Sequence, residues 1–359
     1  MINKNCFNFI CRCLVFELIL MVTLIDITQA ESDKPQNIVD LTAYLPNNHV
    51  KDGSVDYTTF IQQGLNKHSS VKLPNFPISI NERGLTIPSN RKIYFGDNSQ
   101  LILIPSTLER YEIVRIHNVK NVSIYGASIK GDRKMHRGSS GQWGMGISIC
   151  GSENIEIIDG KIEDCWGDGL YIGRIDDSPS AFVTVKGVEL YSNRRNGMSI
   201  TSARDVLIDN IKIFNTGGQS PESGIDIEPN SNRDVIDNIV LNNIYTQDNK
   251  RYGIIVSLNR LIGHRSKEIN IRISNHTDSG SGIGFGMSSV NSGVRDNFKG
   301  EVVVEDCVWQ LNKERAVHYS KHNYSLLVRF KNIRTKDKRN DKVRSLNQQL
   351  RKIKGVRVH

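Results

Sequence analysis

The sequence has few cysteines and no spacing that would link them. It contains 6 cysteines, of which three lie within the first thirty residues. The other three, Cys150, Cys165 and Cys307, are far apart and odd in number, which excludes a disulfide framework and a CxxC-type metal site. Each stands among apolar residues, so we expect three buried thiols without a disulfide partner.

Aromatic residues and proline are also scarce, at 7% of the chain and 9 residues, whereas glycine occurs 29 times. This composition indicates an ordered chain rich in turns. No apolar run after residue 30 approaches the roughly 20 residues that a membrane span needs. A P-loop, a dinucleotide fingerprint, a zinc motif and a Gly-x-Ser-x-Gly turn are all missing, which argues against the enzyme classes built on them.

The chain is basic, with a formal net charge of +9, which favours an anionic partner such as an acidic polysaccharide, a nucleic acid or an anionic membrane. Residues 1–30 have the features of an export signal: Lys4 and Arg12 precede an apolar run over 14–25, and small residues end at Ala30. We therefore predict a signal peptide over 1–30 cleaved near Ala30, one domain over 31–335, and a basic tail or helix over 336–359. An uncleaved anchor is the alternative. The mature chain is expected to be secreted or periplasmic, without a stable membrane span.

A repeated pattern governs the middle of the chain. The segments "DGLYIG", "NGMSIT", "SGIDIE", "YGIIVS" and "SGIGFG" share a glycine followed by alternating apolar residues, and their glycines, at 169, 197, 224, 253 and 282, are 28, 27, 29 and 29 residues apart. An earlier copy is "MGISIC", and a second strand-like series begins with "NVSIYGASI" and "NIEIIDGKI". No helical pattern long enough to connect parallel strands intervenes. The repeats therefore predict an all-β fold, a parallel β-helix in which each repeat makes one turn, with a helical cap over 55–68.

The order "DLTAYLP…VDYTTFIQQGLNKHSSVKLP…ISI…GLTI", followed by these repeats, resembles the pectate-lyase-like superfamily of secreted right-handed β-helix proteins. The resemblance covers about residues 36–330. "GDRKMHRGSSGQWGMGISICGSENI" and "DCWGDGLYIG" also look like stretches of bacterial members. The resemblance implies a right-handed coil and action on carbohydrate. This fold hosts lyases, hydrolases, epimerases and noncatalytic adhesins alike.

The stretch "GIDIEPN" places Asp226 and Glu228 on a strand between two isoleucines. Since strand side chains alternate, the isoleucines are predicted to face the core and the two acids the outer face. Residues at equal positions of successive coils form a column, and neighbours within a column are about 4.8 Å apart. One predicted column is Ser148, Tyr171, Ser199, Asp226 and Ile255, and the next is Cys150, Gly173, Thr201, Glu228 and Ser257.

Polar residues concentrate on the central coils of this face, where a long polymer could lie. Asn196, Asp226 and Glu228 offer oxygens to Ca²⁺, which could neutralise a uronate carboxylate and ease removal of the neighbouring proton. An arginine could stabilise the developing charge, and a lysine could act as base. The predicted catalytic residues are Asp168, Arg195, Asp226, Glu228, His136, Lys250 and Arg233.

The order of an asparagine, an acid-x-acid pair and a basic residue is similar to that of calcium-dependent β-helix lyases of the chondroitinase-B and alginate-lyase type. The similarity implies that Asn196, Asp226 and Glu228 are the metal ligands. Arg233 stands where that family has a lysine base. This is a departure from the family, because arginine holds its proton at any ordinary pH.

A basic loop over 130–143 interrupts the repeats beside the same face. Arginine can pair with a sugar carboxylate and a tryptophan ring can stack on a pyranose, while His136 could give or take a proton. The predicted substrate-binding residues are Lys130, Arg133, Trp143, Tyr171 and Arg251. The alternatives are that Trp143 and Trp166 only pack turns, and that Arg195, Glu222 and Arg251 only pair with one another.

The sequence is compatible with three enzyme chemistries and one non-enzyme function. We expect cleavage of a uronate-containing polysaccharide by β-elimination, with calcium as the possible cofactor and no nucleic acid as partner. Hydrolysis by Asp168 with Asp226 or Glu228, at separations of about 6.5–9.5 Å, is the first alternative. Epimerisation and noncatalytic carbohydrate binding are the others. The motifs of β-helix polygalacturonases are absent, and the oligomeric state is not indicated.

Overall fold

The computed structural model of the chain describes residues 38–288, 295–319, 325–336 and 356–358. The predicted signal peptide lies outside the described residues, as does the predicted tail over 336–359 except for residues 336 and 356–358. Among the described residues, no helix combines the length and the apolar character that crossing a membrane requires.

The repeats fold as predicted, with strands of successive coils pairing in parallel. The short strand that follows each repeat glycine belongs to a first ladder, here called the glycine ladder. Nine of its strands are described: β4 (Leu85–Thr86), β7 (Arg110–His117), β9 (Trp143–Cys150), β11 (Leu170–Ile175), β13 (Asn196–Ile200), β15 (Ser223–Ile227), β17 (Tyr252–Val256), β20 (Ile283–Met287) and β23 (Arg315–Tyr319).

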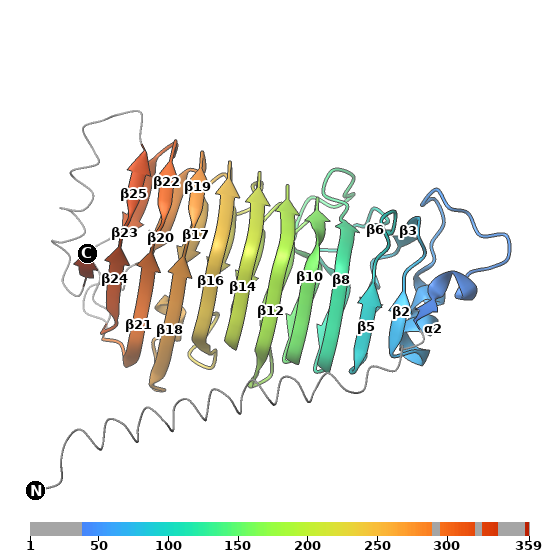
Figure 1. Ribbon diagram of the computed structural model, residues 1–359, viewed down its shortest axis with the longest axis horizontal. Coiled ribbons are helices and arrows are strands. Elements are labelled where there is room, and N and C mark those ends of the chain that lie inside the picture. Colours follow the sequence, from blue (N-terminus) through green and yellow to red (C-terminus); the bar gives the residue numbers. More distant parts are fainter. Residues whose placement is uncertain (1–37, 289–294, 320–324, 337–355, 359) are drawn as a thin grey trace, which may run out of the picture. The chain divides into compact units, whose positions relative to one another are not determined.

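The second series of strands forms a longer ladder, here called the bent ladder, whose members lie side by side in Figure 1. Several of them turn a corner at a residue with positive φ, such as Gly126, Gly187, Asn210 and Asn243, which glycine and asparagine tolerate best. Its main strands are β2 (Ser70–Lys72), β5 (Arg91–Tyr94), β8 (Lys120–Lys130), β10 (Glu153–Glu163), β12 (Ser178–Tyr191), β14 (Ala203–Phe214), β16 (Ile236–Gln247), β18 (Lys267–Ser274), β21 (Phe298–Glu305), β24 (Leu327–Lys331) and β26 (Val356–Val358). Shorter strands pair at the ends of this ladder or along the second halves of its strands: β1 (Val39–Asp40), β3 (Pro77–Ile80), β6 (Gln100–Leu103), β19 (Thr277–Ser279), β22 (Val308–Gln310) and β25 (Arg334–Lys336).

The predicted helical cap is present as α2 (Thr58–Lys67), which lies beside β2 at the blue end of Figure 1. The Asp56 carboxylate accepts a hydrogen bond from the Thr58 backbone N–H and so caps the first turn of α2. Ile61 and Leu65 bury one face of the helix. The shorter helices are η1 (Leu41–Tyr44) and η2 (Asn259–Leu261).

The repeat glycines are needed because the coils approach one another at this corner. A Cβ atom on Gly197 would lie 2.7 Å from the carbonyl oxygen of Gly224, and one on Gly224 would lie 2.5 Å from that of Gly253. The sequence register was wrong for the last copy, since Gly253 meets the carbonyl of Gly284 rather than Gly282. A shift of two residues keeps every side chain on its predicted face.

The interior is filled by the alternating apolar residues, among them Ile225 and Ile227, which are both fully buried. The three predicted thiols Cys150, Cys165 and Cys307 are buried and make no disulfide. Burial raises the pKa of the Cys150 thiol to about 11, so it stays protonated and behaves as a small apolar group. The predicted all-β parallel β-helix is therefore confirmed.

Candidate active site

The glycine ladder carries a cavity of about 420 Å³ on its outer face. Its lining comes from five successive coils, those of β7, β9, β11, β13 and β15, and from the turns that follow them. The lining residues are Arg110, Glu112, His117, Trp143, Met145, Ser148, Cys150, Tyr171, Arg174, Ile175, Arg195, Ser199, Thr201, Asp226, Glu228 and Asn230. The column predicted from Ser148 to Asp226 is confirmed by the strand register.

Asp226 and Glu228 stand together on the last of these coils, at one end of the cavity. Asp226 is only 1% exposed, whereas Glu228 is half-buried. Burial, the nearby Glu228 charge and a hydrogen bond with Glu228 raise the pKa of Asp226 well above its ordinary value, although Arg195 opposes the shift. The raised pKa favours a proton on Asp226, the buried member of the pair.

A buried polar network supports this pair from below. The Asn196 side-chain amide donates to Asp226 Oδ2 at 3.2 Å and to Ser199 Oγ at 3.0 Å. Arg195 forms an ion pair with Asp168 at 2.9 Å, and Ser199 Oγ donates to the same carboxylate at 2.7 Å. Although burial opposes it, the surrounding carboxylates raise the pKa of Arg195, so its guanidinium stays charged.

Asp168 and Asn196 also have a structural task that explains their place before the repeat glycine. Asp168 Oδ1 accepts the backbone N–H of Asn196 at 3.0 Å, and Asn196 Oδ1 accepts the backbone N–H of Ser223 at 3.0 Å. Each side chain thus satisfies the same backbone position on the next coil. Because the Asn196 oxygen is used in this way, its nitrogen faces Asp226.

This orientation does not suit the predicted calcium site. A calcium ligand set needs several oxygens pointing at one space, and the amide offers N–H donors there. No group of three or more His, Cys, Asp or Glu side chains positioned for a metal occurs in the described part of the chain. Asn196, Asp226 and Glu228 as arranged do not fit the ion, so no step below uses one.

Tyr171 and His117 bring two further titratable groups to the cavity. The Tyr171 hydroxyl accepts a hydrogen bond from Thr201 Oγ1 at 2.9 Å, and Thr201 lies one coil before Glu228 in the predicted second column. Burial raises the pKa of Tyr171, so the hydroxyl keeps its proton. Burial lowers the pKa of His117, whose Nε2 lies 2.8 Å from Ser148 Oγ.

The far end of the cavity holds Trp143, which is 38% exposed. The Arg110 guanidinium lies 5.1 Å from the centre of the Trp143 ring, and the two residues are direct neighbours across β7 and β9. The alternative that Trp143 only packs a turn is not what the structure shows, because Trp143 and Arg110 both line the cavity.

The rest of the basic loop is turned away from the cavity. The His136 imidazole stacks on Trp166 with ring centres 3.9 Å apart, and its Nδ1 lies 2.8 Å from Asp132 Oδ2. Arg133 donates to the backbone carbonyls of Ser192 and Gly217, which fastens the loop across two coils. Both side chains fix the loop rather than line the cavity. Lys130 is exposed at the end of β8 and does not line the cavity either.

Lys250, Glu222 and Arg251 lie on the next corner, outside the cavity lining. Lys250 forms an ion pair with Glu222 at 2.6 Å, and Arg251 lies over the ring of Tyr252. The expected mutual pairing of Arg195, Glu222 and Arg251 is therefore corrected, because Arg195 pairs with Asp168 and Glu222 with Lys250.

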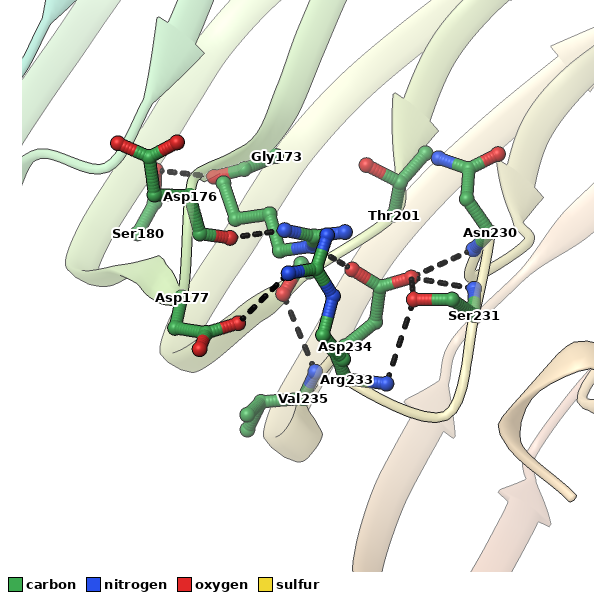
Figure 2. A network of polar contacts seen from close by, with 12 residues as sticks. Gly173, Asp176, Asp177, Ser180, Thr201, Asn230, Ser231, Arg233, Asp234 and Val235 are labelled. Carbon is green, nitrogen blue, oxygen red and sulfur yellow. Dashed lines mark hydrogen bonds and ion pairs between the residues drawn. The ribbon is translucent and has the colours of Figure 1, made fainter. Parts of the chain in front are cut away.

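Arg233 is carried outward by the turn that follows Glu228. Figure 2 shows this turn, where Asp234 accepts hydrogen bonds from the backbone N–H groups of Asn230 and Ser231 at 2.8 Å and 2.6 Å. The Arg233 guanidinium leaves the turn on its exposed side and pairs with Asp177 at 3.4 Å. Arg233 thus does not line the cavity, unlike Arg174, which pairs with Asp234 and lines the cavity.

Sequence reasoning missed several lining residues, namely Arg110, Glu112, His117, Arg174 and Asn230. The first three lie on β7, whose segment "RYEIVRIH" has no glycine and so was not aligned with the repeats. Its register, with Arg115 beside Ser148 and His117 beside Cys150, shows that extending the alternation one coil upstream finds them. Arg174 lies near the end of β11, beyond the aligned repeat segment, and Asn230 lies on the turn after β15.

No protein-family model matches this chain. Two curated proteins of Bacillus subtilis (strain 168) are similar to it. The SPbeta prophage-derived uncharacterized protein YorA is 32% identical over 162 residues, covering 40% of this chain and 28% of that protein. The uncharacterized protein YclG is 27% identical over 232 residues, covering 58% of this chain and 38% of that protein.

Several solved structures share the arrangement of coils. The N-terminal fragment of gene product 12 of bacteriophage Phi29 has a TM-score of 0.68 at 16% identity, covering 91% of this chain and 56% of that one. A tailspike protein of Acinetobacter baumannii bacteriophage Fri1, a capsular polysaccharide depolymerase, has a TM-score of 0.58 at 14% identity, covering 88% and 62%. An iota-carrageenase complexed with iota-carrageenan fragments has a TM-score of 0.61 at 11% identity, covering 86% and 92%. The chain is a right-handed parallel β-helix.

This β-helix agrees with the resemblance to the pectate-lyase-like superfamily drawn from the sequence. At such low identities the solved structures show the fold alone, and the site must be argued from its own residues. The chain spans 28% and 38% of the length of the two curated relatives.

Proposed function

We propose that this β-helix is an enzyme that cleaves a glycosidic bond of an acidic polysaccharide, with the Asp226–Glu228 pair as its proton donor. One observation carries the proposal: two carboxylates, one of them buried and with a raised pKa, stand two residues apart at the end of one strand in the wall of a cavity. Neighbours of the same fold include a capsular polysaccharide depolymerase and an iota-carrageenase, which supports the substrate class.

The pair suits the step that is common to all glycosidic cleavage, protonation of the departing oxygen. A carboxyl whose pKa is raised keeps its proton near neutral pH and can deliver it as the C–O bond breaks. Glu228, the more exposed member, reaches the substrate side, and Asp226 lies behind it. The Asn196 amide holds Asp226 in place.

Hydrolysis is the chemistry that this arrangement supports best. The pair gives its proton to the departing oxygen, water adds to the anomeric carbon, and the proton that the water loses restores the pair. Asp168 does not serve as the second carboxylate predicted from the sequence, because Arg195, Ser199 and the Asn196 N–H already occupy it.

β-Elimination is the second candidate, and Tyr171 is the observation that favours it. The protonated Tyr171 hydroxyl, which lies in the same cavity, could protonate the departing oxygen while the carboxyl pair, in its ionised form, removes the proton next to the uronate carboxylate. Lys250, the base predicted from the sequence, lies outside the cavity lining, and so does Arg233, which stands where the calcium-dependent family has a lysine. A polysaccharide substrate and a formal net charge of +9 agree with a protein that is secreted or periplasmic.

A screen with product-specific readouts tests the proposal. The purified chain is incubated with alginate, pectate, glycosaminoglycans and sulfated galactans, and reducing ends and unsaturated-uronate absorbance are recorded together. Reducing ends without absorbance identify hydrolysis, and both signals together identify elimination. A chelator arm tests the predicted calcium directly. Asp226→Asn should lose the product signal, and Asp278→Asn, another buried acid, is the matched control. Product formation that persists in Asp226→Asn would refute the assignment.

A further inference from the structure

Two arginine–tryptophan pairs occur among the described residues, and only one of them lines the cavity. Arg194 lies 3.6 Å from the centre of the Trp166 ring, and His136 stacks on that ring at 3.9 Å. The Trp166 ring is thus contacted by both the Arg194 guanidinium and the His136 imidazole. The Arg110–Trp143 pair, by contrast, lines the cavity, and Trp143 keeps 38% of its surface exposed.

Arg110 has a free charge in this setting. It is exposed, and no ion pair to an acid is present for it within the described residues. The nearest lining acid on its own strand, Glu112, is paired with Arg115 at 3.1 Å. An arginine beside an aromatic face offers both halves of a sugar-binding surface, since the ring packs on a pyranose and the guanidinium pairs with an anionic substituent.

The position of this pair separates it from the bond to be cut. Trp143 lies on β9 and the Asp226–Glu228 pair on β15, three coils farther along the ladder. Three steps of strand spacing amount to about 14 Å, which is more than one sugar ring. A sugar on Trp143 must therefore be a different unit of the same polymer from the sugar at the carboxyl pair.

We infer that Arg110 and Trp143 form an outer subsite that binds a carboxylated or sulfated sugar unit of the substrate chain. The inference rests on the proposed function, and it adds the class of sugar and the minimum length of the substrate. Binding should strengthen when the oligosaccharide becomes long enough to reach from the carboxyl pair to Trp143.

Binding of size-graded oligosaccharides to the full chain tests the subsite apart from catalysis. The probes are oligouronates, carrageenan oligosaccharides and neutral malto-oligosaccharides of two to eight units, measured by calorimetry on the Asp226→Asn background. Arg110→Gln should weaken binding of long anionic probes by at least about tenfold, the loss expected for one charge-assisted hydrogen bond. It should leave neutral probes unchanged, whereas Trp143→Ala should weaken both. The oligouronate and carrageenan arms tell a carboxylate from a sulfate ligand.

Phe182 and Arg204 supply a matched control elsewhere on the solenoid. The Arg204 guanidinium lies 5.4 Å from the Phe182 ring, and Phe182 is 48% exposed, but neither lines the cavity. Phe182→Ala and Arg204→Gln should leave all affinities unchanged, and a melting curve checks that each variant folds.

Unchanged binding in Arg110→Gln and Trp143→Ala would overturn the subsite, as would affinity independent of probe length. In either case cleavage by the wild type, lost in Asp226→Asn, would leave the proposed function standing. A wild type that cleaves yet binds only neutral probes would overturn both the subsite and the acidic substrate class.

Discussion

Two buried aspartates in this solenoid have similar burial and different surroundings. Asp226 is 1% exposed and Asp278 is 0% exposed. Asp278 accepts hydrogen bonds from Thr246 Oγ1 at 2.6 Å, Ser281 Oγ at 2.6 Å and Asn312 Nδ2 at 2.5 Å. Burial raises the pKa of Asp278 to about 6, against the effect of these donors. Asp226 has a second carboxyl beside it and a cavity above it.

The comparison separates what burial does from what a site needs. Burial alone is enough to raise the pKa of an acid, as Asp278 shows. Its donors are all neutral side chains, and Asp278 does not line the cavity, so a proton on Asp278 has no substrate to reach. Asp226 differs because Glu228 continues the pair into the cavity. The predictions below test whether this difference is the one that matters.

The largest effect is expected for activity. Asp226→Asn should lower the rate of product formation by about 10²–10⁴, the usual contribution of a positioned proton donor. Asp278→Asn should leave the rate unchanged. The measurement is initial rate at saturating substrate, on whichever polysaccharide the screen identifies. Equal losses in the two variants would mean that burial, and not the site, accounts for the result.

The next effect concerns stability at the base of the site. Asp168→Ala leaves the guanidinium of Arg195 without its buried partner, which should cost about 3–5 kcal/mol in the free energy of unfolding. Urea unfolding at neutral pH measures it. Arg195→Met together with Asp168→Ala should recover part of the loss, because no charge is then left unpaired. A cost below about 1 kcal/mol for Asp168→Ala would show that water reaches Arg195.

A smaller effect follows from the raised pKa of Asp278. An acid whose pKa rises on folding stabilises the fold fully below its ordinary value of 3.8 and loses that contribution as pH rises through about 6. The wild type should therefore lose up to about 3 kcal/mol relative to Asp278→Asn over this interval, at about 1.4 kcal/mol per pH unit. Urea unfolding of both proteins between pH 4 and pH 7 gives the difference. A constant difference would contradict the raised pKa.

The smallest effect is expected for the exposed ion pair that sequence reasoning had placed in the site. The Lys250 side chain is 66% exposed, so Lys250→Ala should change the free energy of unfolding by less than about 1 kcal/mol. The rate of product formation should also stay as in the wild type. A large loss of activity would restore Lys250 as a base and favour elimination.

The sequence predicted the solenoid because its periodicity is a property of the chain itself. Each glycine marks a corner where two coils meet, and the strand alternation assigned Ile225 inward and Asp226 outward correctly. The orientation of the Asn196 amide could not be read in this way, because it depends on a backbone N–H donated from the next coil. The placement of Arg233 depends on the turn over 229–234, whose shape is set by Asp234 and not by any repeat.

The cavity ends where the carboxyl pair stands, on the last of its five lining coils. A polymer held there would have nearly all its contacts on one side of the bond that is cut. The fragment on that side would stay bound and the other would leave at once, with little to retain it. Such an asymmetric grip predicts that shortening an oligosaccharide on the gripped side weakens its binding much more than shortening it on the other side.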